Sequence, residues 1–94
     1  MDFSKSDVRL LCDALRHIRK VVYDPLDPEA MQAVNSLDKL TRDIYNHTKN
    51  QISIGEIDNC IIAIDSFIDD HPDSAPSYDP LRKKLLSSRF LLDK

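Results

Sequence analysis

Apolar residues recur along the first half of the chain at steps of three and four residues, which is the spacing of one face of an α-helix. The first run begins after Ser4 and stops at Tyr23-Asp24-Pro25, and the second follows Asp27 and is expected to finish near Asn50. The inward face of the first helix is predicted to be Val8, Leu11, Cys12, Leu15, Ile18 and Val22, and that of the second Ala30, Ala33, Val34, Leu37, Leu40 and Ile44.

Two further runs occupy the second half. The third follows Ser53 and must end before Pro72, because proline disfavours helical backbone in the residue that precedes it. A connector rich in proline and serine follows, and we expect a fourth helix capped by Ser77 or Asp79, with Pro80 in its first turn. The inward faces are predicted to be Ile57, Cys60, Ile61, Ile64, Phe67 and Ile68 in the third helix, and Leu81, Leu85 and Leu92 in the fourth.

The first three helices share one starting signal. A short polar side chain stands just before each apolar run: Ser4, Asp27 and Ser53. Such side chains accept hydrogen bonds from the first free backbone N–H groups of a helix, and Asp7 and Glu56 stand where they can return the bond. The sequence therefore predicts an all-α fold, an antiparallel up-down-up-down four-helix bundle in a single domain over residues 1–94. A three-helix core with a detached fourth helix is the alternative.

Composition agrees with a helical globular domain. The chain is 41% hydrophobic and 31% charged, and it holds a single glycine, whereas sheets joined by tight turns usually need several. The sequence has neither an apolar run long enough to span a bilayer nor the apolar region of a signal peptide, so we expect a cytoplasmic protein. The two cysteines, Cys12 and Cys60, lie on predicted inward faces and are interpreted as small buried residues, with a disulfide or a reactive thiol as alternatives.

Charge is distributed unevenly over the second half. Residues 51–76 contain six acidic side chains and no lysine or arginine, whereas residues 77–94 contain five basic and two acidic ones. One interpretation is that the opposite charges help the third and fourth helices pair. The other is that the acidic third helix is a docking face for a basic partner protein. A pI near 5.5 and an aromatic content of 6% argue against nucleic acid as the partner.

Three apolar residues do not fit the predicted inward faces. Leu86 and Phe90 point away from Leu81 in the fourth helix, and Ile62 points away from Ile57 in the third. Together with the C-terminal Leu91 they predict a second apolar surface. It contacts a partner protein, a second copy of the chain in the simplest version, or another part of this chain if the chain folds differently than predicted.

Two groups of residues are candidates for chemistry. The acidic residues around His71 could bind a divalent cation, but they lack the ligand order of an EF-hand and are interpreted as a solvated helix end. His47-Thr48-Lys49 resembles the phosphorelay histidine of histidine phosphotransfer domains, although Asn50 and Gln51 depart from that pattern. In size and number of helices the predicted bundle also resembles cytosolic bacteriocin immunity proteins, a likeness of architecture without a shared motif.

The sequence contains no recognisable catalytic or cofactor-binding motif. We therefore predict a non-enzymatic protein–protein interaction module: an adaptor, inhibitor, immunity factor or small regulatory protein. Phosphotransfer by His47, or binding of a divalent metal, is the alternative. The residues predicted to contact the partner are Ile62, Asp65, Asp69, Asp70, Leu86 and Phe90.

Overall fold

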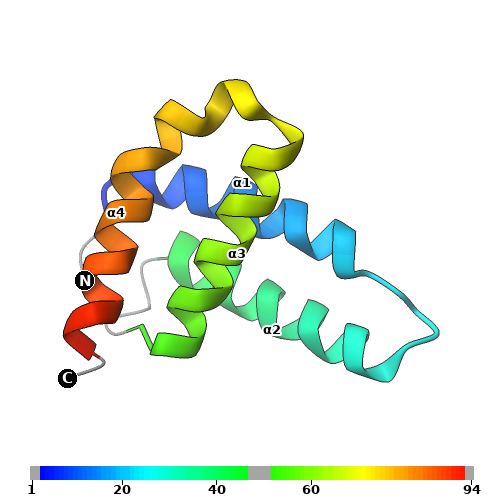
Figure 1. Cartoon of the computed structure of the whole chain (residues 1–94). Coiled ribbons are helices and arrows are strands. Elements are labelled where there is room, and N and C mark those ends of the chain that lie inside the picture. Colours follow the sequence, from blue (N-terminus) through cyan, green and yellow to red (C-terminus); the bar gives the residue numbers. More distant parts are fainter. Residues whose placement is uncertain (1–2, 47–51, 93–94) are drawn as a thin grey trace.

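Within the residues that the structure describes, four α-helices make up the fold, which confirms the all-α, four-helix prediction (Figure 1). The computed structural model describes residues 3–46 and 52–92. The helices are α1 (Lys5–Val22), α2 (Pro28–Tyr45), α3 (Ile54–Asp70) and α4 (Ala75–Leu92), with a short 3-10 helix η1 (Pro72–Ser74) between α3 and α4.

The helices do not pack in the order in which they follow one another. α1 packs against both α2 and α3, and α4 packs against α3. In Figure 1, α1 and α2 form one hairpin, α3 crosses α1, and α4 runs back beside α3 in the opposite direction. α1 and α3 are thus the central pair. The regular up-down-up-down order of the bundle stays a prediction.

The predicted capping signals are present at the starts of three helices. Ser4 Oγ accepts a hydrogen bond from the Asp7 amide at 3.1 Å, and Ser53 Oγ accepts one from the Glu56 amide at 3.2 Å. Both acidic side chains return the bond to the amide of the serine, which completes two capping boxes. Asp27 Oδ1 accepts from the Glu29 amide at 3.0 Å.

The predicted start of the fourth helix is wrong. α4 begins at Ala75, ahead of both Ser77 and Asp79, because the 3-10 turn from Pro72 to Ser74 leads directly into it. Pro80 therefore lies inside the helix, where it cannot donate a backbone hydrogen bond. In Figure 1 the first turns of α4 run at an angle to the remainder of the helix, as expected near an internal proline.

The C-terminal cap of the second helix lies within the described residues. α2 ends at Tyr45, and the Asn46 amide donates to Arg42 O at 2.9 Å as the cap. The end predicted near Asn50 lies outside the described residues.

The buried core is built mainly from α1 and α3. Fully buried side chains of α1 and α3 meet those of α2 and α4 in one cluster, and both cysteines are among them as free thiols, as predicted. Two predicted core positions are instead exposed: Ala33, and Leu92 in the last turn of α4. The cluster consists of Val8, Leu11, Cys12, Ala14, Leu15, Leu37, Leu40, Ile44, Ile52, Ile57, Cys60, Ala63, Ile64, Tyr78, Leu81 and Leu85.

Tyr78 attaches the start of α4 to α1. Its side chain is only 1% exposed, and its hydroxyl donates a hydrogen bond to Leu10 O at 2.8 Å. The Tyr78 ring also lies 5.3 Å from the Phe67 ring of α3. Burial, helped by the nearby charge of Asp13, raises the pKa of Tyr78 to about 12. Tyr78 lies directly after the predicted connector and was assigned to no inward face from the sequence, so its role in the core was missed.

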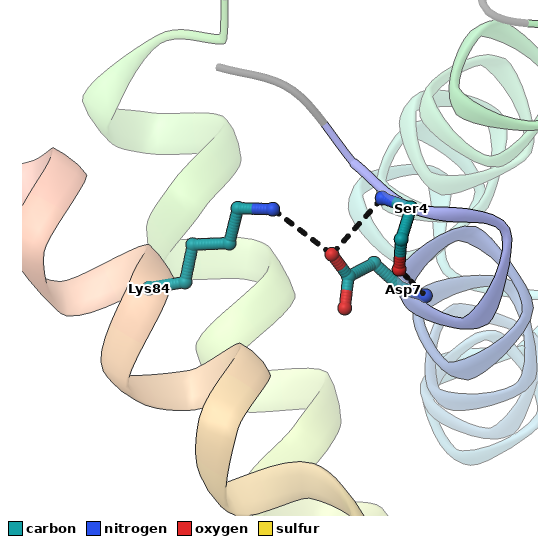
Figure 2. Close-up of polar contacts among 3 residues, drawn as sticks. All are labelled: Ser4, Asp7 and Lys84. Carbon is teal, nitrogen blue, oxygen red and sulfur yellow. Dashed lines mark hydrogen bonds and ion pairs between the residues drawn. The ribbon is translucent and has the colours of Figure 1, made fainter.

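A second polar contact joins α4 to the first turn of α1. Figure 2 shows the side chain of Lys84 pointing toward Asp7, whose Oδ2 accepts hydrogen bonds from Lys84 Nζ at 2.9 Å and from the Ser4 amide at 3.1 Å. Partial burial acts to raise the pKa of Asp7, but the hydrogen bonds from Lys84 and Ser4 outweigh it, and the pKa is lowered. The fourth helix is therefore packed on the other helices, and the alternative of a detached helix is wrong.

We expect Tyr78→Phe to weaken the protein's response to alkali. The pKa of Tyr78 is about 12 in the folded state, whereas its ordinary value is 10.0. The contribution of the neutral hydroxyl to the free energy of unfolding is therefore complete below pH 10 and is lost as the pH rises toward 12. At neutral pH the substitution should lower the free energy of unfolding by about 1 kcal/mol, through loss of the hydrogen bond. Above pH 10 the free energy of the variant should fall less steeply than that of the wild type.

Urea unfolding followed by circular dichroism at a series of pH values measures this difference. Burial also raises the pKa of Cys60 to about 12. Cys60 is present in both proteins, so its effect cancels in the comparison. Identical slopes for the two proteins above pH 10 would contradict the buried position of the tyrosine.

Candidate interaction surface

Two ion pairs join the exposed sides of α3 and α4. Arg82 Nε lies 2.9 Å from Asp65 Oδ1, and Arg89 Nε lies 2.7 Å from Asp58 Oδ1. The partners are seven residues apart on each helix, which is about two turns, so all four side chains lie along one row. The earlier aspartate pairs with the later arginine, as expected for two helices that run antiparallel.

These contacts explain the uneven charge of the second half. Two of the acidic residues of α3 bind arginines of α4, which supports the interpretation that opposite charges help the two helices pair. The hydrogen bond with Asp65 raises the pKa of Arg82. All four side chains are about 40–50% exposed, so each pair is expected to contribute only about 0–1 kcal/mol.

The three apolar residues singled out in the sequence lie on both sides of this row. Ile62 is 56% exposed, Leu86 39% and Phe90 64%. At about 100° per residue, Ile62 lies about 40° around α3 from Asp58, on the side away from α4. By the same geometry Leu86 and Phe90 lie about 40° and 80° around α4 from Arg82, on the side away from α3. We call the surface formed by these three residues and the two ion pairs the α3–α4 face.

Of the predicted acidic contact residues, the structure places two on this face and one elsewhere. Asp65 belongs to the ion-pair row, and Asp69, one turn further along, is exposed on the side of Ile62. Asp70 instead lies against α1, where its Oδ2 is 2.9 Å from His17 Nε2. The two atoms are close, but their geometry does not make a hydrogen bond. The structure thus brings Ile62, Asp65, Asp69, Leu86 and Phe90 together, without Asp70.

A small aromatic cluster surrounds His17 at the junction of α1, α3 and η1. The ring of His17 lies 5.5 Å from that of Phe67 and 6.1 Å from that of His71, and the rings of Phe67 and His71 are 4.6 Å apart. His71 is an exposed cap of α3. This cluster was not predicted from the sequence, because His17 lies far along the chain from Phe67 and His71.

The two alternative functions, metal binding and phosphotransfer, find no site among the described residues. Among residues 3–46 and 52–92, no group of three or more histidine, cysteine, aspartate or glutamate side chains is close enough to hold a metal ion. His47, proposed for phosphotransfer, lies outside the described residues. In the part of the chain that the structure describes, none of the helices combines the length and the apolar character needed to cross a membrane.

Comparison with known proteins places the chain in no family. No protein-family model, no curated protein and no solved structure matches it.

A double-mutant cycle on Asp65→Ala and Arg82→Ala tests the ion-pair row. We expect a coupling free energy of at most about 1 kcal/mol that shrinks with added salt, because both side chains are half exposed. Urea unfolding of the four proteins at low and high salt measures it. The matched control cycle combines Asp65→Ala with Lys83→Ala, which removes the exposed neighbour of Arg82. Equal coupling in the two cycles, or coupling that salt leaves unchanged, would contradict a specific pair.

Proposed function

We propose that this chain is a non-enzymatic protein–protein interaction module that binds a partner protein through the α3–α4 face. The observation that carries the proposal is the exposure of Ile62, Leu86 and Phe90 beside the row of two ion pairs that joins the antiparallel helices α3 and α4. An exposed aromatic residue beside aliphatic ones resembles the few anchors that supply most of the binding energy in known interfaces. An adaptor, an inhibitor, an immunity factor or a small regulatory protein would each bind its partner through such a face.

The charge around the apolar residues favours one kind of partner. Asp69 is exposed near the C-terminal end of α3 and Asp73 is exposed in η1, which follows it, and no hydrogen bond or ion pair joins either one to another described residue. A partner with an apolar centre and basic residues at its rim would bury Leu86 and Phe90 and match these carboxylates. We therefore propose a different protein as the partner, rather than a second copy of this acidic chain. We also propose that the protein acts in the cytoplasm, as expected from the sequence.

Site-specific photo-crosslinking in the source cell tests this function. A photoreactive amino acid is placed at Leu86 in one variant and, as the matched control, at Leu26, a leucine of the α1–α2 loop that is 91% exposed. We expect a defined covalent adduct with another protein from position 86 and none of that mass from position 26. The adduct from position 86 should disappear when Phe90→Ser is added, because the aromatic anchor is lost.

Three outcomes would overturn the proposal. Identical adducts from the two positions would show nonspecific contact, and the absence of an adduct at position 86 would show that the face is unoccupied in the cell. An adduct of twice the mass of the chain would identify a homodimer in place of a different partner. Circular dichroism of each variant verifies that the helices remain folded.

A further inference from the structure

The six arginines of the chain fall into two groups. Three of them pair with aspartates on a neighbouring helix: Arg19 with Asp38, Arg82 with Asp65, and Arg89 with Asp58. The other three are Arg9, Arg16 and Arg42. Among the described residues no ion pair joins any of these three to a carboxylate, and all of them line the groove between α1 and α2.

The groove consists of two neighbouring hollows that share Arg16 and Tyr45. The larger has a volume of about 490 Å³, and Lys5 and Arg9 also line it. The smaller, of about 350 Å³, is lined further by Thr41 and Arg42. Volumes of this size are in the range of ligand-binding clefts in proteins.

The floor of the larger hollow is apolar. It is made by Val8 and Cys12, which are both buried, and the Cys12 thiol contacts Thr41 O across the helix pair at 3.9 Å. Burial raises the pKa of the Cys12 thiol, which keeps the floor uncharged at neutral pH. Tyr45, 63% exposed, forms part of the opposite wall. The groove thus combines basic edges with an apolar bottom.

Its basic residues are arranged along its length. Lys5, Arg9 and Arg16 are separated by four and seven residues, so they lie on one side of α1, over about 16 Å at about 1.5 Å per residue. That length matches about five residues of extended peptide. A ligand that satisfies the groove needs negative charges spaced along it and an apolar group facing Val8 and Cys12.

We propose that the α1–α2 groove is a binding site for an acidic peptide segment of a partner protein, with carboxylates at Lys5, Arg9, Arg16 and Arg42 and an apolar side chain over Val8 and Cys12. Arginine binds carboxylate oxygens through two parallel hydrogen bonds, which makes the unpaired arginines suited to such a ligand. This site lies on α1 and α2, whereas the α3–α4 face lies on α3 and α4. The proposal for the groove therefore does not depend on the function proposed for that face.

Charge favours a peptide over nucleic acid as the occupant. Asp13 lines the larger hollow between Arg9 and Arg16, and Asp38 lines the smaller one. A continuous phosphate backbone passing along the groove would meet these carboxylates, and the chain as a whole carries a net charge of −3. A peptide can place its charged residues at the arginines and neutral ones opposite the aspartates.

Fluorescence anisotropy with synthetic peptides tests the proposal on the full chain. The probe is a labelled peptide of alternating glutamate and leucine. Comparison probes are a lysine–leucine peptide, a glutamate-only peptide and an oligothymidylate. The groove variant is Arg9→Glu with Arg16→Glu, and the matched control is Lys39→Glu with Lys83→Glu, which changes the net charge equally at exposed positions that do not line these hollows.

We expect the wild type to bind the glutamate–leucine peptide more tightly than any comparison probe. The groove variant should lose affinity by about tenfold or more, and the control variant by less than about twofold. If the charge reversals unfold the chain, Arg9→Gln with Arg16→Gln serves instead, with loss of binding again expected. Failure of the wild type to bind, equal losses in the two variants, tighter binding of oligothymidylate, or equal binding of the glutamate-only peptide would each overturn the proposal.

Discussion

The contact between α1 and α3 is the interaction on which the rest of the structure depends. These helices supply the fully buried side chains Leu11, Leu15, Ile57 and Ile64. Ala14 and Ala63, one on each helix, are also fully buried, and such small side chains let helices approach closely. α2 packs against α1 on one side of this pair, and α4 packs against α3. Apolar burial of this kind supplies most of the free energy that offsets the conformational entropy of a small domain.

Once the core is closed, polar contacts determine how the outer helix lies and what remains on the surface. Tyr78 and Lys84 connect α4 to α1, and the arginine–aspartate row sets its register on α3. Two of the six arginines take part in these contacts, and a third, Arg19, pairs with Asp38; the three that form no ion pair with another described residue all line the α1–α2 groove. The polar contacts also leave Leu86 and Phe90 on the outside of α4. Both proposed binding sites therefore present side chains that stay exposed at the surface, Leu86 and Phe90 in one and Arg9 and Arg16 in the other.

Local signals predicted the helices well, and long-range contacts were beyond them. Ser4 and Ser53 act within four residues of their own position, so the sequence pattern alone located two helix starts correctly. The start of α4 was predicted wrongly because a proline normally marks the first turn of a helix. Here the helix instead begins at Ala75, directly after the 3-10 turn and ahead of the proline.

The candidate site shows the same division. Helical periodicity identified Ile62, Leu86 and Phe90 as pointing away from the core, and the structure places all three on exposed positions. Asp70 was grouped with them by its charge, but it faces His17 of α1, and no sequence spacing relates residues so far apart in the chain.

Native-state hydrogen exchange measured by NMR tests the central claim most directly. If the α1–α3 contact organises the fold, the amides of Leu11, Leu15, Ile57 and Ile64 should exchange most slowly, through global unfolding alone. The amides of α2 and α4 should exchange faster, through partial opening that leaves the central pair intact. Slowest exchange in α2 or α4, with α1 or α3 opening first, would contradict the account.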